Sequence, residues 1–181
     1  MDFTLDKKHE MARSLFREFA EKEVKPLAIE VDETEIFPRE TVTKMAKYGF
    51  LGIPVAKEYG GQGADPLAYV MCVEELSKVC ATTGVIVSAH TSLCADPIAM
   101  YGTPEQKEKY LVPLAKGEKL GAFALTEPNA GTDAQGAVTK AVLDGDEYVL
   151  NGSKIFITNG KEADIYVVIA CTEIKVDAKG R

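Results

Sequence analysis

The sequence lacks the residues and spacings of several common site types. It contains no tryptophan, only two histidines and four cysteines, and no C-x-x-C spacing. His9 and His90 lie far apart and have no acidic ligand spacing nearby, so no metal site is expected. Three of the cysteines fall within apolar helical patterns, which favours free buried thiols over disulfides or zinc and indicates a reducing compartment. The four are Cys72, Cys80, Cys94 and Cys171.

A basic surface and a long apolar run are also missing. The net charge of −7 disfavours nucleic acid and anionic membranes as partners, because both require a positive surface. The amino terminus has no apolar signal region, and no run approaches the roughly 20 apolar residues of a membrane span. A cytoplasmic protein is therefore expected. The 181 residues, 46% of them hydrophobic, suffice for a real core in one large domain or two small ones.

The first part of the chain has helical periodicity. Thr4 or Asp6 can cap a first helix, which Pro26 should bend or shift because proline lacks a backbone donor. Pro38 opens a second helix that ends at Gly49. The apolar positions expected to face the core are Met11, Leu15, Phe16, Phe19, Val24, Leu27 and Val31 in the first helix, and Val42, Met45 and Ala46 in the second.

A glycine-rich loop precedes the third helix. The run from Gly61 to Pro66 imitates half of a dinucleotide fingerprint, but no strand precedes it and Pro66 replaces the last glycine. We interpret it as a turn that feeds a helix capped by Asp65. The expected inner face of this helix comprises Tyr69, Val70, Val73, Leu76 and Val79, and the expected solvated face carries Glu74 and Glu75.

Two further helices are expected before Gly117. The segment 82–101 is apolar almost all round and rich in small residues, which predicts a central helix, interrupted by Pro97. Thr103 and Gln106 form a capping box that opens the next helix, and Gly117 ends it.

The periodicity becomes extended after Gly117. Strands are predicted over 121–126, 137–143, 147–151, 153–158 and 164–171, with a hairpin turn at 144–146. We therefore predict an α+β fold, with an amino-terminal all-α domain over residues 1–117 and the first part of a small antiparallel β-barrel or sandwich over 118–181. The strand edge left open by the last residues indicates that this is part of a longer protein.

Two turns carry the most specific pattern. Residues 121–133 read G-A-F-A-L-T-E-P-N-A-G-T-D, and residues 151–160 read N-G-S-K-I-F-I-T-N-G. Small residues let the backbone approach a bulky ligand, while threonine hydroxyls and free N–H groups can meet carbonyl or phosphate oxygens. Such turns suit a flat polar cofactor.

Taken in this order behind a helical region, the two turns resemble those of the acyl-CoA dehydrogenases. The resemblance covers the whole chain and is close to the short-chain, butyryl-CoA type of anaerobic bacteria. It implies an acyl-CoA dehydrogenase-like fold whose carboxy-terminal helical domain is absent. It also implies FAD as cofactor, with the cofactor-binding residues Phe123, Ala124, Leu125, Thr126, Gly131, Thr132, Phe156, Ile157 and Thr158.

The family oxidises a thioester between its alpha and beta carbons, and its catalytic base is a glutamate of the absent domain. No catalytic residue is thus expected in this chain, which alone should be inactive. The segment 82–101 matches the family's acyl-pocket helix, and three- to four-residue spacing places the expected pocket residues on one face. The substrate-binding residues implied are Thr132, Ile86, Ala89, His90 and Leu93.

Each assignment has a plainer alternative. Thr126 and Thr158 can be ordinary strand threonines, Phe123 and Phe156 can be core aromatics, and the pocket positions can be plain helix packing. Glu127 is expected to bond backbone N–H groups in its turn rather than to act as a general base, because no second titratable group accompanies it.

The resemblance also implies partners. These are a short-chain acyl-CoA, an electron-transferring flavoprotein and, for the full-length protein, further copies of itself. The alternatives within the superfamily are an acyl-CoA oxidase or a branched-chain acyl-CoA dehydrogenase. The alternative from another class is a non-catalytic binding or assembly module with the same fold.

Overall fold

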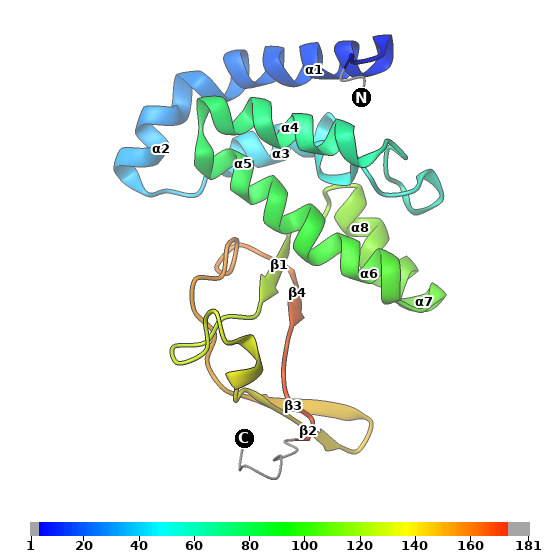
Figure 1. Cartoon of the computed structure of the whole chain (residues 1–181), viewed down its shortest axis with the longest axis vertical. Coiled ribbons are helices and arrows are strands. Elements are labelled where there is room, and N and C mark those ends of the chain that lie inside the picture. The colour runs from blue at the N-terminus through cyan, green and yellow to red at the C-terminus, as the bar shows by residue number, and fades with distance from the viewer. Residues whose placement is uncertain (1–3, 174–181) are drawn as a thin grey trace.

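The computed structural model describes residues 4–173, in which a helical body stands above a smaller β region (Figure 1). Irregular helical turns join several of the α-helices. The helices are α1 Lys7–Phe19, α2 Ala28–Thr34, α3 Arg39–Lys47, α4 Pro66–Val79, α5 Ala81–Ser88, α6 Asp96–Tyr101, α7 Pro104–Gln106 and α8 Val112–Ala115. The strands are β1 Gly121–Ala124, β2 Lys140–Asp144, β3 Glu147–Asn151 and β4 Ile165–Val168.

The predicted helix caps are confirmed. Asp6 accepts a hydrogen bond from the backbone N–H of His9, and Asp65 accepts one from Ala68. Thr103 forms the complete capping box with Gln106. Gly117 follows α8 in the left-handed region, at a φ of 70°, where a side chain would be strained.

Pro26 and Pro97, which were both expected to disturb a helix, act differently. A π-helical segment, Ala20–Val24, and a 3-10 turn, Lys25–Leu27, separate α1 from α2 around Pro26, which confirms the predicted disturbance. Pro97, by contrast, does not interrupt its helix, and that prediction was wrong. The π-helical segment Ala89–Ala95 precedes it and widens the ladder, so Pro97 enters the first turn of α6 without breaking the rod from α5 to α6 (Figure 1).

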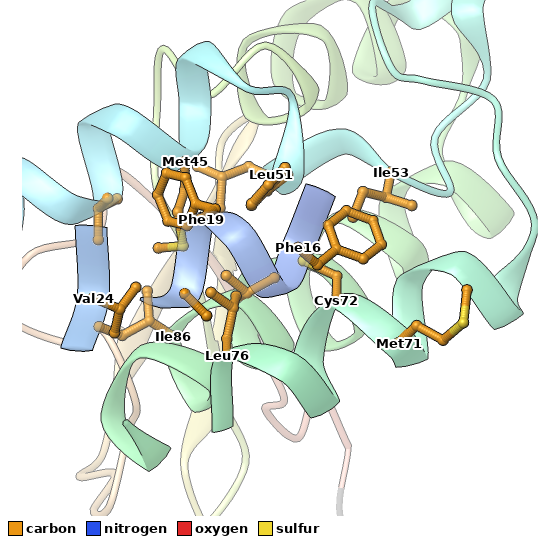
Figure 2. Close-up of a cluster of buried hydrophobic side chains, with 14 of the residues drawn as sticks. Phe16, Phe19, Val24, Met45, Leu51, Ile53, Met71, Cys72, Leu76 and Ile86 are labelled. Carbon is orange, nitrogen blue, oxygen red and sulfur yellow. The ribbon is translucent and has the colours of Figure 1, made fainter. Parts of the chain in front are cut away.

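The main core lies between α1, α3, α4 and the 3-10 turn Phe50–Gly52 (Figure 2). The ring of Phe50 is 1% exposed and meets those of Phe16 and Phe19 edge to face, at centroid distances of 5.1 and 5.0 Å. Met45 and Leu76 are fully buried beside them. Burying each of these large side chains contributes about 1.5–3 kcal/mol.

Some apolar positions predicted to face the core are exposed. Met11 is 65% exposed, Leu15 42% and Val70 56%. The buried face of α1 is the one that packs against α4. This face is narrower than the stripe of apolar residues that the sequence places along the helix.

Glu75 corrects the predicted solvated face of α4. Its side chain is 3% exposed and accepts hydrogen bonds from Arg13 at 2.8 Å, Arg17 at 3.1 Å and Lys78 at 3.1 Å. These partners, Arg17 foremost, lower the pKa of Glu75 to about 2. The carboxylate is buried because cations from α1 and α4 replace its water. Glu74 is exposed as predicted.

The strands form two pairs. β2 and β3 make the predicted antiparallel hairpin, in which Asp144 faces Glu147 and Gly145 takes a φ of 65°. β1 and β4 pair in parallel. The predicted strand over 153–158 is wrong, because Phe156 adopts a left-handed φ of 57° that ends the extended alternation.

The four cysteines are free; Cys72 and Cys94 are fully buried, whereas Cys80 and Cys171 are only half-buried. Among residues 4–173, no helix has the length and apolar character needed to cross a membrane.

The imidazole of His9 joins two helix caps. Its Nδ1 lies 2.8 Å from Asp6 Oδ1 and its Nε2 lies 2.9 Å from Asp65 Oδ2. The hydrogen bond with Asp65 is the largest of the effects that raise the pKa of His9. A raised folded-state pKa means that the stabilisation is complete below the unfolded value, near 6.5, and is lost as the pH rises through the folded value.

We therefore expect His9→Gln to lower the melting temperature more at pH 5.5 than at pH 8.5, as followed by circular dichroism. Asp6→Asn and Asp65→Asn are matched controls, because asparagine still caps a helix but no longer holds a charge beside His9. The difference between His9 and His9→Gln should shrink in that double-asparagine background. A difference independent of pH would contradict the assignment.

Candidate functional site

The two turns singled out in the sequence lie side by side. The backbone N–H of Ile155 donates to the carbonyl of Thr126 at 2.9 Å. The ammonium of Lys154 donates to the carbonyl of Leu125 at 2.8 Å. Segments separated by a whole hairpin are thus joined by one backbone hydrogen bond and one lysine side chain.

A buried ion pair fixes the first turn. Glu127 is 4% exposed and accepts hydrogen bonds from the N–H groups of Val138 at 2.7 Å and Thr139 at 2.9 Å, and from Lys154 Nζ at 2.7 Å. Lys154 is the main cause that lowers the pKa of Glu127 to about 2. The predicted role of Glu127 as a turn residue is confirmed.

The expectation that Glu127 has no titratable neighbour was wrong, because Lys154 accompanies it. The sequence does hold a signal for this pair. Lys154 stands directly before the apolar run Ile155–Ile157, where an unpaired ammonium would be costly.

The outer rim of the first turn is open to a ligand. Glu127 and Ala130 exchange backbone hydrogen bonds of 3.0 and 3.1 Å across it. Gly131 and Thr132 are exposed, and a Cβ added to Gly131 would meet no atom within 4 Å. A bulky group can therefore approach the backbone here.

The second turn presents an aromatic ring. Phe156 is 89% exposed, and its backbone is left-handed. Ile157 and Thr158 next to it are half-buried. A bulky residue held in this region costs energy, and such residues concentrate at ligand sites. The exposed ring and the open rim fit a flat cofactor.

β1 presents its side chains alternately to two sides. Ala122 and Ala124 are buried, whereas Leu125 and Thr126 after the strand are half-buried. Phe123 points the other way and lines an apolar cavity of about 470 Å³. The other residues that line it are Pro97, Ile98, Tyr101, Gly102, Gln106, Tyr110, Val167 and Ile169.

The four residues predicted to line the acyl pocket do not share one environment. Ile86, Ala89 and His90 are buried, but Leu93 is 43% exposed. Three- to four-residue spacing places side chains on one face only in a uniform α-helix, and the π-helical segment Ala89–Ala95 changes the angular step between residues.

His90 bridges two pieces of backbone. Its Nδ1 accepts a hydrogen bond from the N–H of Gly121 at 3.0 Å, and its Nε2 donates to the carbonyl of Leu114 at 3.2 Å. Burial lowers the pKa of His90 to about 4, so the ring is neutral at pH 7. Any part of His90 in an acyl pocket is therefore exerted through Gly121 and Leu114.

Asn159, like Lys154, was given no role at the site from the sequence. Its Nδ2 donates to the carbonyls of Ile86 at 3.2 Å and Gly121 at 3.0 Å. The sequence signal was present, since asparagine followed by glycine is typical of a left-handed turn. Among the described residues, no group of three or more His, Cys, Asp or Glu side chains is arranged to hold a metal ion.

Comparison with known proteins finds relatives over nearly the whole chain. Residues 6–118 match the family model described as the acyl-CoA dehydrogenase N-terminal domain, and residues 122–180 match that of the middle domain. The chain is 64% identical over 180 residues to the short-chain specific acyl-CoA dehydrogenase of Clostridium acetobutylicum, covering 99% of this chain and 48% of that protein.

Solved structures of similar proteins share the fold of this chain. The butyryl-CoA dehydrogenase of Megasphaera elsdenii is 47% identical with a TM-score of 0.92, over 99% of this chain and 47% of that one. A glutaryl-CoA dehydrogenase from Mycobacterium smegmatis in complex with FADH2 is 34% identical with a TM-score of 0.87, over 92% and 43%.

The chain spans about half the length of the curated relatives it matches. The expected order of a helical domain followed by the start of a β domain is confirmed. Because the two family models together cover nearly all of the sequence in that order, the chain belongs to the acyl-CoA dehydrogenase family.

Proposed function

We propose that this chain is the amino-terminal half of a flavoprotein that oxidises a short-chain acyl-CoA, of about butyryl size, to the 2-enoyl-CoA. The observation that carries the proposal is the meeting of the two turns, through the Ile155–Thr126 hydrogen bond and the Lys154–Glu127 ion pair. Two motifs that are separated in the sequence thereby lie next to each other. The identity to a short-chain specific relative supports the substrate size.

FAD fits the surface described above. Thr126 and Thr132 offer hydroxyls on the first turn, and Phe156 offers an aromatic face on the second. Thr158 offers a further hydroxyl beside it, and Thr132 also reaches toward the CoA arm. When bound, FAD supplies a two-electron acceptor for the hydride that leaves the beta carbon. The supporting residues are Phe123, Ala124, Leu125, Gly131 and Ile157.

No residue of this chain is proposed as the base that removes the alpha proton. Glu127 holds its charge against three donors and has a pKa of about 2, so it is a poor proton acceptor near neutral pH. The chain's own contribution is to orient the thioester and to keep water from the reacting carbons.

The proposed acyl pocket lies along α5 and the segment that follows it. Ile86 and Ala89 are buried there, whereas Leu93 is exposed. The bulky side chains of Ile86 and Leu93 would limit the length of the tail, and His90 completes the proposed set through its backbone contacts. The proposed partners are an electron-transferring flavoprotein and, for the full-length protein, further copies of itself.

The flavin spectrum tests the proposal. The chain should turn yellow when expressed with its downstream coding region, and butyryl-CoA should bleach the flavin absorbance. Thr158→Val should slow that bleaching at least about tenfold or lower flavin occupancy, because one hydrogen bond to the cofactor is lost.

Thr43→Val is the matched control, since Thr43 is an exposed threonine on α3 that bonds only the carbonyl of Arg39 among the contacts described. It should leave both measurements unchanged. A colourless protein in every preparation would favour the assembly module, and a normal bleaching rate in Thr158→Val would remove the hydroxyl from the site.

A further inference from the structure

Asn159 holds two separate elements with one amide. Its side-chain nitrogen donates to the carbonyl of Ile86, near the end of α5, and to the carbonyl of Gly121, the first residue of β1. The side chain is 8% exposed. Because both acceptors are carbonyls, only the nitrogen of the amide can face them.

Gly121 is held from the opposite side as well. Its N–H donates to His90 Nδ1, so both of its backbone polar groups are bound by side chains. A Cβ on Gly121 would lie 2.7 Å from the sulfur of Cys94, which leaves no room for any other residue. We call Gly121, His90 and Asn159 the Gly121 junction.

The same asparagine shapes the second turn. Asn159 follows Thr158 directly, has a φ of 63°, and its carbonyl accepts hydrogen bonds from the N–H groups of Glu162 at 2.9 Å and Ala163 at 2.8 Å. The position of Thr158 is therefore tied to α5 through one side chain.

This arrangement carries two costs in stability. Among the described residues, Asn159 Oδ1 is buried without a hydrogen-bond partner, and a left-handed backbone adds strain. Costs of this kind concentrate at functional sites. The unsatisfied oxygen and the strained backbone indicate that the exact placement of this turn is what matters.

We propose that Asn159 is a positioning residue that sets the distance between the acyl-pocket helix α5 and the turn that offers Thr158. It thereby aligns the acyl carbons with the cofactor. This inference rests on the proposed function above and deepens it. Misplacement of reacting groups by about 1 Å can cost a hundredfold in rate, so a single amide is enough to matter.

Asn159→Gly tests the proposal, because glycine accepts the left-handed backbone and removes only the amide. Thr41→Val is the matched control. Thr41 is 2% exposed and lies on α3, outside the Gly121 junction and the proposed acyl pocket. Both variants remove a buried polar group, but only the first touches the Gly121 junction.

In the flavin-loaded protein expressed with its downstream coding region, Asn159→Gly should keep its flavin and lose about 10- to 100-fold in kcat with butyryl-CoA. The ratio of its rates with butyryl-CoA and hexanoyl-CoA should also move severalfold toward one. Thr41→Val should leave that ratio unchanged. An equal change in both variants, or a loss that only follows the folded fraction, would overturn the proposal.

A second measurement needs no flavin. Hydrogen exchange of the Gly121 amide in the 181-residue chain should be at least about tenfold faster in Asn159→Gly and unchanged in Thr41→Val. Unchanged exchange would overturn the junction itself. If the wild-type protein takes up no flavin, the proposed function fails, and this exchange still decides whether Asn159 holds the helix and the turn together.

Discussion

Glu127→Gln is expected to lower the melting temperature by roughly 10 °C and to abolish flavin binding, because it breaks a buried ion pair at the centre of the site. The amide would turn a donor toward one of three donors, Val138 N–H, Thr139 N–H or Lys154 Nζ. Melting followed by circular dichroism and the flavin absorbance of the purified protein measure the two effects.

Glu147→Gln is the matched control for Glu127, because Glu147 lies on the exposed strand β3. It should leave both quantities unchanged. The pH dependence gives an independent check. With its folded pKa lowered to about 2, Glu127 stabilises the fold above its unfolded value, near 4.3, and loses that effect as the pH falls toward 2. If Glu127→Gln melts like the wild type at pH 7, the ion pair does not support the turn.

Gly52→Ala is expected to destabilise the protein by about 3 kcal/mol or more, and to leave little folded protein on expression. A Cβ at Gly52 would lie 2.3 Å from the carbonyl oxygen of Ala115 in α8. That atom belongs to a helix backbone, so it cannot move aside as a side chain could. Urea denaturation of any folded fraction measures the effect.

Gly131→Ala makes the same chemical change where nothing lies within 4 Å of the new Cβ. Its unfolding curve should match that of the wild type. Its flavin occupancy should fall, because the methyl group would occupy the rim that the cofactor approaches. If Gly52→Ala unfolds at the wild-type urea concentration, the contact between the Phe50–Gly52 turn and α8 is looser than described.

Features set by neighbouring residues could be predicted from the sequence. The caps at Asp6, Asp65 and Thr103 depend on groups within three residues of each other, and all three form as expected. The hairpin at Gly145 is equally local. In each of the three caps, the side chain that accepts the hydrogen bond lies three residues before the backbone N–H that donates it.

Features that depend on a distant partner could not be predicted. Glu75 is buried because Arg13 and Arg17 reach it from another helix. Phe156 looks like a strand residue in the sequence, but its backbone is left-handed in the structure. The two turns of the site were found as motifs, and the apolar run after Lys154 indicates that its ammonium needs a partner, but only the fold identifies that partner as Glu127.

The π-helical segment Ala89–Ala95 has a consequence for how this helix can change in evolution. Such a segment carries one residue more than the same length of α-helix. Deleting a residue there would restore regular winding and leave α5 and α6 nearly unmoved, because four α-helical residues sweep almost the same angle as five π-helical ones. A one-codon deletion could thus change the side chains within the segment, which borders the proposed acyl pocket, without displacing the helices on either side.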